Sequence, residues 1–261
     1  MIKERRRGVA KQLIRYAEKY GQILDTGNAS ELLTLSPKNR QHAMRALANL
    51  SKYYGCYDEW KAIKQNYDLR WTTDNDMDAF NAITDSKHNY TAMLTWLKDV
   101  CSKIPQSYAN ILFFDTLTGS RPDEACQSIH LLKSGADNYL NNERQILEHF
   151  NYKQIFIRRT KKAYISLVTP TILELAMKAE DCGYNALRLV IKRRGLDMHM
   201  GYCLKIFSTH LRTKGIAPEL IDLLQGRIPK VVFARHYFRP DFVKEVKRMR
   251  KMISSLLPAS F

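Results

Sequence analysis

Apolar residues recur at intervals of three and four positions along most of the chain, which is the spacing of one face of an α-helix. In residues 37–54, Met44, Leu47, Leu50 and Tyr54 follow this spacing, behind a serine and a proline that are typical of a helix start. The same spacing covers residues 2–20, 57–71, 90–104, 107–117, 171–181, 184–195, 202–215 and 217–226. We therefore expect most of the chain to be helical.

One stretch, residues 144–170, departs from the helical spacing. It reads RQILEHFNYKQIFIRRTKKAYISLVTP, with β-branched and aromatic residues on both sides of a charged RRTKK centre at 158–162. Such a pattern predicts a β-hairpin with a basic tip. The expected fold class is thus mainly α with one small antiparallel β-sheet.

The most polar stretch without periodicity is TTDNDMD, residues 72–78, which is the best candidate for a linker. A chain of 261 residues is long enough for one large or two modest domains. We therefore expect a helical domain over residues 1–73 and a larger domain over residues 74–261.

The charge balance is strongly basic. The chain has 42 Lys and Arg against 26 Asp and Glu, a net charge of +16. Clustered cations bind phosphates with release of counterions, so the excess indicates a polyanionic partner. The charge alone would also suit an RNA-binding protein, but no RNP, KH or zinc-knuckle motif is present.

Other classes of protein are not indicated. No apolar run approaches the ~20 residues of a membrane span, and the basic start has no apolar segment typical of a secretory signal. The five cysteines are scattered and form no CxxC pair. Their spacing supports neither a disulfide framework nor a zinc site, and it favours reduced thiols in a cytoplasm.

The segment TLTGSRPDEA, residues 116–125, is a candidate phosphate site. Gly119 is expected to end one helix and Pro122 to begin the next, which places Arg121 at a helix N-terminus with Glu124 within reach of its guanidinium. A fixed arginine at a helix start can bind phosphate. A structural Arg–Glu pair explains the same residues. The lysines of the hairpin tip, Lys161 and Lys162, could also hold a phosphate or donate a proton, or could simply be solvated.

Four segments taken together resemble the tyrosine recombinases of the phage-integrase family. TLTGSRPDEA is similar to the family's first arginine box, FSTHLRTKG (207–215) to its FATHL helix, and LLQGR (223–227) to its LLGH box, with a tyrosine following in ARHYFRP (234–240). Two segments resemble the archaeal integrases of spindle-shaped viruses and integrated elements even more closely. They are residues 223–240 and residues 36–61, SPKNRQHAMRALANLSKYYGCYDEWK.

The resemblance implies a helical core-binding domain followed by a recombinase catalytic domain. It implies an enzyme that cleaves and rejoins double-stranded DNA through a 3′-phosphotyrosyl intermediate, as a tetramer on DNA, in the cytoplasm of an archaeal host. Neither a metal nor a cofactor is implied. It also implies that the C-terminal residues 242–261 form a helix that docks on a neighbouring chain, with docking on its own chain as the alternative.

The resemblance assigns roles to individual residues. Tyr237 matches the nucleophile, Arg121 the first arginine, and Arg227 the third basic position. Lys161, or Lys162 as the alternative, matches the hairpin lysine that protonates the leaving oxygen. The supporting residues are Glu124, Lys205 and His236, and the expected DNA contacts are Lys38, Arg40, Arg45, Arg158 and Arg159.

At two positions the sequence departs from the family pattern. Leu204 stands where the second phosphate-binding arginine is expected, and Gly201 stands where a histidine or lysine is expected. Lys205 is adjacent, but one helical residue turns it by about 100°; His199 could reach only after a backbone shift. A leucine cannot bind a phosphate. The departure implies an integrase with impaired cleavage, or a DNA-binding protein that keeps the fold and has lost cleavage.

Overall fold

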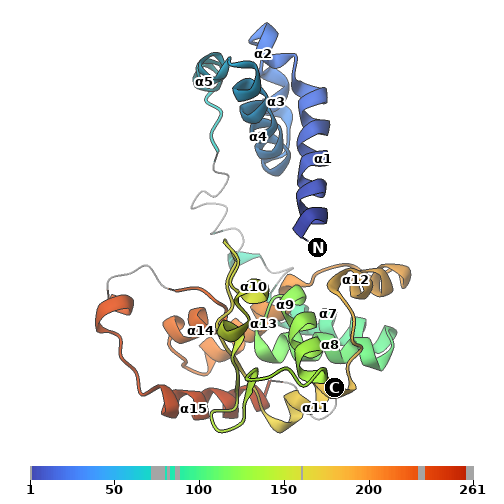
Figure 1. Ribbon diagram of the computed structural model, residues 1–261, viewed down its shortest axis with the longest axis vertical. Helices are drawn as coiled ribbons and strands as arrows, with labels where there is room; N and C mark the ends of the chain where they lie inside the picture. Colours follow the sequence, from blue (N-terminus) through green and yellow to red (C-terminus); the bar gives the residue numbers. More distant parts are fainter. Residues whose placement is uncertain are drawn as a thin grey trace. The chain divides into compact units, whose positions relative to one another are not determined.

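The structure of the protein is a computed structural model, which describes residues 2–71, 80, 83–85, 89–159, 161–228 and 233–256, apart from the side chains of residues 2–9, 234 and 235 (Figure 1). The chain divides into two compact units, Met1–Asp85 and Ser86–Phe261. The expected linker, residues 72–78, lies outside the described residues.

The first unit is helical. It contains α1 (Ile2–Tyr20), α2 (Ile23–Thr26), α3 (Ser30–Thr34), α4 (Pro37–Tyr54) and α5 (Tyr57–Asn66). α1 packs along α4, and the largest fully buried side chains of this unit are Trp60, Tyr20, Leu32, Met44 and Leu47. Tyr54, expected on the apolar face of α4, is instead 68% exposed, because it lies in the last turn beyond the core.

The second unit is built around a central helix. Its helices are α7 (Tyr90–Lys103), α8 (Gln106–Thr118), α9 (Pro122–Lys133), α10 (Lys153–Phe156), α11 (Pro170–Lys178), α12 (Tyr184–Arg193), α13 (Gly201–Thr213), α14 (Pro218–Leu224) and α15 (Phe242–Ser254), with the 3-10 turn η2 (His149–Tyr152) and the π-helical turn η3 (Phe233–Tyr237). α8 packs against α7, α9, α11 and α13, and its residues from Ala109 to Thr118 are all buried. A helix that is apolar on every side is the expected centre of such a unit.

A small antiparallel sheet is present, as predicted. Its strands are β1 (Leu140–Asn141), β2 (Ile146–Leu147) and β3 (Ser166–Leu167), in the order β1-β2-β3, with Leu140 opposite Leu147 and Ile146 opposite Leu167.

The predicted β-hairpin is formed only in part, since β2 pairs with β3 at its base but these strands are two residues long. The residues before the tip form η2 and α10, because this short helical segment buries Phe156 completely against the rings of Tyr139 and His149, 6.0 and 4.3 Å away between centroids. The tip is closed by an antiparallel bridge between Ile157 and Lys162 and by the Arg158 N–H, which donates to the Lys161 carbonyl at 3.0 Å.

The C-terminal helix α15 packs on its own chain. Val246, Met249 and Ile253 of α15 belong to the core of the second unit, in which α15 lies against α13 (Figure 1). The structure thus shows the alternative, docking on its own chain, whereas docking on a neighbouring chain stays a prediction.

Candidate functional site

Arg121 lies where three distant segments of the second unit meet. It is the N-cap residue of α9, and its backbone N–H donates to Oε2 of Glu124 at 3.1 Å. Its Nη1 donates to the Glu124 carboxylate at 3.0 and 3.2 Å and to the Lys162 carbonyl at 3.0 Å, and its Nη2 donates to the Gln225 carbonyl at 3.3 Å. Arg121 is thus anchored to α9, to the end of α14, and to the turn between Arg158 and Lys162, which we call the tip turn.

These anchors leave part of the Arg121 guanidinium available. Of its five N–H groups, Nε–H and the second hydrogen of Nη2 have no hydrogen-bond partner among the described residues. The side chain is 21% exposed, whereas the Glu124 side chain is 3% exposed. A preorganised, partly exposed guanidinium edge of this kind can bind two oxygens of a phosphate.

Gly226 and Gln225 make the meeting of these segments possible. Gly226 has a φ of +73°, and a β-carbon there would overlap the carbonyl oxygen of Lys162. Gln225 is 3% exposed, and its Nε2 donates to the Leu204 carbonyl of α13 at 2.9 Å. The LLQGR segment therefore brings the tip turn, Arg121 and α13 together.

A second glycine sets the packing of the FSTHL helix on the arginine box. Gly119 ends α8 with a φ of +63°, and a β-carbon there would overlap the ring of Phe207, which is 1% exposed. α13 thus lies directly against the turn that precedes Arg121. The close approach fixes the register of α13 relative to the site.

Leu204 lies beside Gln225, whose side chain donates to its carbonyl. Its own side chain is half-buried. Gly201 begins α13, and no heavy atom would lie within 4 Å of a β-carbon built there. Lys205 is exposed, with its Nζ 5.9 Å from the ring centroid of Tyr202.

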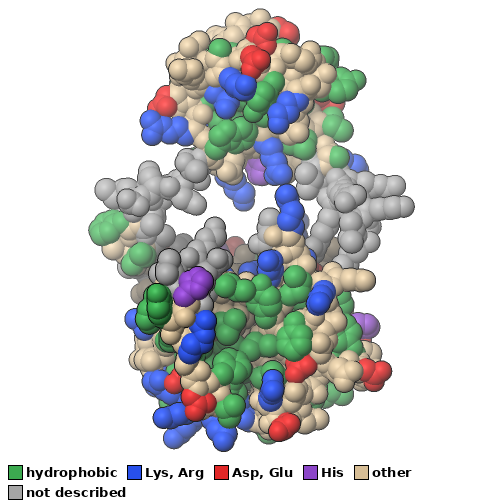
Figure 2. All heavy atoms as spheres, turned by 60° about the vertical axis from the view of Figure 1, so that its left-hand side comes forward, with side chains coloured by type: hydrophobic (Ala, Val, Ile, Leu, Met, Phe, Trp, Pro, Cys, Tyr) green, Lys and Arg blue, Asp and Glu red, His purple; other side chains and the backbone are tan. Residues whose placement is uncertain are grey.

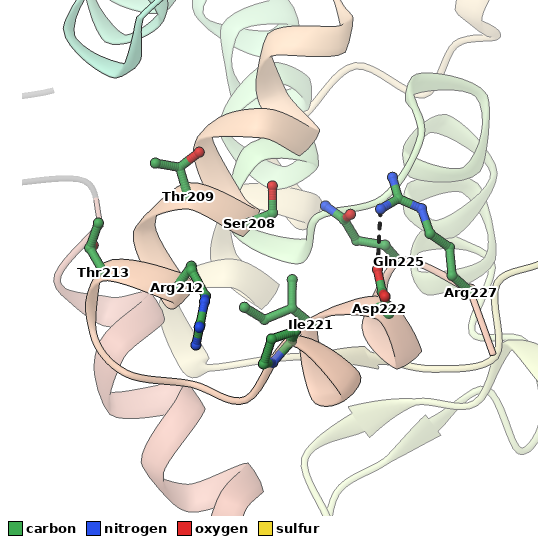
Figure 3. A pocket seen from close by; sticks show the side chains of 9 residues that line it. Ser208, Thr209, Arg212, Thr213, Ile221, Asp222, Gln225 and Arg227 are labelled. Carbon is green, nitrogen blue, oxygen red and sulfur yellow. Dashed lines mark hydrogen bonds and ion pairs between the residues drawn. The ribbon is translucent and has the colours of Figure 1, made fainter. Parts of the chain in front are cut away.

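Next to Gln225, a pocket of about 330 Å³ opens between α13 and α14 (Figure 3). Hydroxyls of Ser208, Thr209 and Thr213 line it on the α13 side, together with the guanidinium of Arg212. Arg227 also lines the pocket, but its Nη1 pairs with Oδ1 of Asp222 at 3.2 Å. The hydroxyls of Ser208 and Thr213 already donate to the carbonyls of Leu204 and His210, at 2.9 and 2.8 Å, and Asp222 competes for Arg227. The pocket therefore has few donors left for an anionic ligand.

Tyr237 ends the π-helical turn η3 and is 72% exposed. The turn is closed by the Phe238 N–H, which donates to the Phe233 carbonyl at 2.9 Å. His236, beside it, is also exposed. Among the described residues, no hydrogen bond joins Tyr237 to Arg121. The phenol is thus open to solvent and carried on a single turn.

The two lysines of the tip turn differ in their backbone contacts, not in the exposure of their side chains. The side chains of Lys161 and Lys162 are both exposed, and Arg159 is exposed beside them. The backbone carbonyl of Lys161 accepts from the Arg158 N–H at 3.0 Å, and that of Lys162 accepts from Arg121. The turn therefore holds Lys162 by its backbone next to the site.

Two of the expected DNA contacts are instead paired within the chain. Arg158 binds the carboxylates of Asp123 and Glu124, and Arg40 donates to the carbonyls of Leu32, Leu33 and Leu35 at the end of α3. Their guanidiniums find acceptors that a list of basic residues does not reveal. Lys38 and Arg45 are exposed on α4.

His210, the histidine of the FSTHL motif, has a structural role in this geometry. It is 8% exposed; Nε2 lies 3.0 Å from the Met252 carbonyl of α15, and Nδ1 lies 3.4 Å from the Tyr90 hydroxyl of α7. Burial lowers the pKa of His210, with a smaller opposing effect of the Met252 carbonyl. The neutral imidazole links α7, α13 and α15.

Sequence reasoning missed four residues that shape the site, Asp123, Asp222, Gln225 and Gly226. Only Gly226 had a signal, since a glycine directly after a helix often adopts positive φ. Within the described ranges, no group of three His, Cys, Asp or Glu could hold a metal ion, and no helix has the length and apolar character of a membrane span.

Comparison of the chain with protein-family models, with curated proteins and with solved structures found no match. The assignment of a function therefore depends on the geometry of the site and on the motifs of the sequence.

Proposed function

We propose that this protein is a tyrosine site-specific recombinase, an integrase of an archaeal mobile element that cleaves and rejoins double-stranded DNA. The observation that carries the proposal is Arg121, which three segments hold in place while the Nε edge of its guanidinium stays available. Two of these segments, α9 and the end of α14, carry motifs that resemble recombinase boxes, and the third carries Lys161 and Lys162. We expect the protein to act as a tetramer on its attachment site in the cytoplasm of the host.

In the proposed reaction, the phenol oxygen of Tyr237 attacks a phosphodiester of the DNA. A bond forms between this oxygen and phosphorus, the bond from phosphorus to the 5′-oxygen breaks, and the phenol proton passes to solvent or a nearby base. The product is a 3′-phosphotyrosyl link that keeps the energy of the phosphoester for rejoining.

The basic residues would serve the transition state. The pentacoordinate phosphate gains negative charge, which the preorganised Arg121 would stabilise. Lys161, or Lys162, would protonate the leaving 5′-oxygen. Arg227 would contribute after exchanging Asp222 for a phosphate oxygen.

Leu204 predicts that cleavage by this chain is impaired. A leucine beside Gln225 offers no donor to the phosphate, and the exposed Lys205 packs by Tyr202 instead. For the same reason, a second candidate function is a sequence-specific DNA-binding protein that keeps the integrase fold without cleavage. Leu204 and Gly201 favour it, whereas the anchored Arg121 favours the enzyme.

The experiment is covalent trapping on nicked duplex DNA. A pool of nicked duplexes with randomised sequence is incubated with the protein, and protein–DNA adducts are isolated under denaturing conditions and sequenced. Adducts that disappear with Tyr237→Phe, but persist with Tyr53→Phe at another exposed tyrosine, would establish the nucleophile. DNA binding without any adduct would favour the second function.

Restoring the missing arginine provides a gain-of-function test. Leu204→Arg should raise the rate of adduct formation by about 10²-fold or more, the usual effect of one transition-state donor. The Gln225 contact uses the backbone of residue 204 and is retained. An unchanged rate in a folded variant that binds DNA would contradict our account of the defect.

A further inference from the structure

Arg158 stands at the base of the tip turn, and its side chain turns toward α9. Its Nη1 donates to Oδ2 of Asp123 at 3.2 Å, and its Nη2 makes a short hydrogen bond to Oε1 of Glu124. Its backbone N–H closes the turn on the Lys161 carbonyl at 3.0 Å. One residue thus joins the turn that carries the lysines to the helix that carries Arg121.

Glu124 lies between two arginines. Its carboxylate accepts from Nη1 of Arg121 and from Nη2 of Arg158, and its side chain is 3% exposed. Asp123 is the second acceptor for Arg158. Two carboxylates and two guanidiniums therefore balance in charge, and removal of one cation would leave a buried carboxylate only partly compensated.

Arg158 is anchored to carboxylates on both terminal nitrogens, each of which donates one of its two hydrogens, and its Nε is buried without a partner among the described residues. Its side chain is 24% exposed. Arg121 donates to one carboxylate and to two backbone carbonyls. The two arginines therefore share Glu124, and Arg158 holds it together with the neighbouring Asp123.

We propose that Arg158 is a positioning residue for Arg121. It holds Glu124, which holds Nη1 of Arg121 and so directs the free edge of that guanidinium outward. Through its backbone it also fixes the tip turn, so the place of Lys161 is coupled to that of Arg121. The inference rests on the proposed recombinase function for its consequence in cleavage, but the positioning of Arg121 can be measured without it.

The test compares Arg158→Met with wild type and with Arg248→Met. The control removes an arginine that is also paired, with Glu245 at 3.6 Å on α15, outside the site. Two quantities are measured: the rate at which phenylglyoxal modifies Arg121, by mass spectrometry of its peptide, and the rate of covalent adduct formation on saturating nicked duplex. Duplex affinity and circular dichroism are recorded for each variant.

Arg158→Met should speed the modification of Arg121 by at least about threefold, because its Glu124 anchor is loosened. It should also slow adduct formation by about 10- to 100-fold, the effect of a small misplacement of a catalytic group. Duplex affinity should stay within about twofold of the control, because the terminal nitrogens of Arg158 already donate to Asp123 and Glu124. Arg248→Met should change neither rate.

Unchanged reactivity of Arg121 in Arg158→Met would overturn the inference, as would a loss of duplex affinity as its only effect. If Arg158→Met does not fold, Arg158→Lys is used in its place to test the inference. This variant keeps the positive charge at position 158 but cannot bridge the carboxylates of Asp123 and Glu124. Its Arg121 should then react faster than in wild type, and an equal rate overturns the inference. If wild type forms no adduct, the proposed cleavage function is contradicted. The rate at which phenylglyoxal modifies Arg121 then tests by itself whether Arg158 positions Arg121.

Discussion

At the scale of single residues, the site depends on the absence of a side chain at position 226. The positive φ of Gly226 and its contact with the Lys162 carbonyl leave no room for a β-carbon. This contact also sets how closely the Lys162 carbonyl approaches Arg121. A residue without functional groups thus determines the geometry of the cations.

Gly226→Ala should therefore destabilise the protein and displace the tip turn. The left-handed backbone alone costs a non-glycine residue about 1–2 kcal/mol, and the overlap with Lys162 adds to this. Thermal unfolding measures the loss. Gly201→Ala is the control, because a β-carbon at position 201 would meet no neighbouring side chain or distant backbone within 4 Å. This variant should leave the midpoint of thermal unfolding almost unchanged. Equal stability of the two variants would contradict the role of Gly226.

The ion pair of Arg227 with Asp222 yields a second prediction at this scale. The pair is exposed, so its loss should change the free energy of unfolding by less than about 1 kcal/mol. Asp222→Asn should release Arg227 and tighten duplex binding. Glu174→Gln, which frees Lys178 on α11, removes the same charge elsewhere. An equal gain of duplex affinity in both variants would mean that the change in net charge, and not the release of Arg227, strengthens binding.

The identity of the site residues was predictable only where a motif spans several of them. Arg121 and Glu124 could be paired from their spacing at a helix start, and the structure forms that pair. The partners of Arg158 and Arg40 could not be predicted, because a basic pattern does not show which carboxylates or carbonyls a long side chain will meet after folding; their contact with DNA stays a prediction. Gln225 gave no signal, because its function depends on the distant Leu204 carbonyl.

At the scale of elements, a buried histidine ties the sheet to the segment that follows it. His149 of η2 is fully buried between the Tyr139 hydroxyl, 2.9 Å from Nδ1, and the Ser166 hydroxyl of β3, 2.8 Å from Nε2. Burial lowers its pKa from 6.5 to about 3. The imidazole is therefore neutral in the native state at moderately acidic pH.

A depressed native pKa makes stability depend on pH in a defined direction. Below pH 6.5 the unfolded chain binds a proton at His149 that the native chain does not bind, so stability is lost as the pH falls from 6.5 toward 3. Between pH 6.5 and pH 5 the loss is about 2 kcal/mol. His210 acts in the same direction, whereas the buried Asp115, whose pKa is raised, acts in the opposite one.

The contribution of His149 can be isolated by comparison with His149→Gln, whose amide can also bond both hydroxyls. The free energy of unfolding of each protein is measured in urea at pH 6.5 and pH 5. Wild type should lose about 2 kcal/mol more than the variant over this range. Equal losses would show that His149 titrates normally in the native state.

The structure of helices was more predictable than that of the sheet. Helical spacing over ten or more residues, with Pro37 and Pro122 at helix starts and Gly55 and Gly119 at helix ends, agrees with the observed helices. The strands are two residues long, too short for alternation to identify them. The aromatic residues between β2 and β3 suggested strands, but burial of Phe156 selects a short helix.

The packing of α15 on its own chain predicts the effect of shortening one of its buried side chains. Met249 is 0% exposed, so Met249→Ala should destabilise the second unit by about 2–5 kcal/mol. Because the contact is within one chain, the thermal midpoint should not depend on protein concentration. A midpoint that rises with concentration in wild type would indicate docking between chains instead.

At the scale of the whole molecule, the two units have separate cores and unequal charge. The two hydrophobic clusters share no residue, and each lies within one unit. The unit Ser86–Phe261 carries 28 Lys and Arg against 15 Asp and Glu, so it holds +13 of the +16 net charge. Lys and Arg side chains are visible on the surface of both units (Figure 2). Such an arrangement predicts that most of the electrostatic attraction to DNA belongs to the second unit.

This distribution can be tested by comparing the full chain with fragments 1–85 and 86–261. If DNA is the partner, the logarithm of its binding constant falls linearly with the logarithm of salt concentration, with a slope of about −0.9 for each phosphate neutralised. Fragment 86–261 should keep most of the slope of the full chain, while fragment 1–85 should bind weakly and with a shallow slope. Circular dichroism and cooperative unfolding of each fragment are the controls. A steeper slope for fragment 1–85 would mean that the placement of its cations, rather than net charge, determines how this protein binds a duplex.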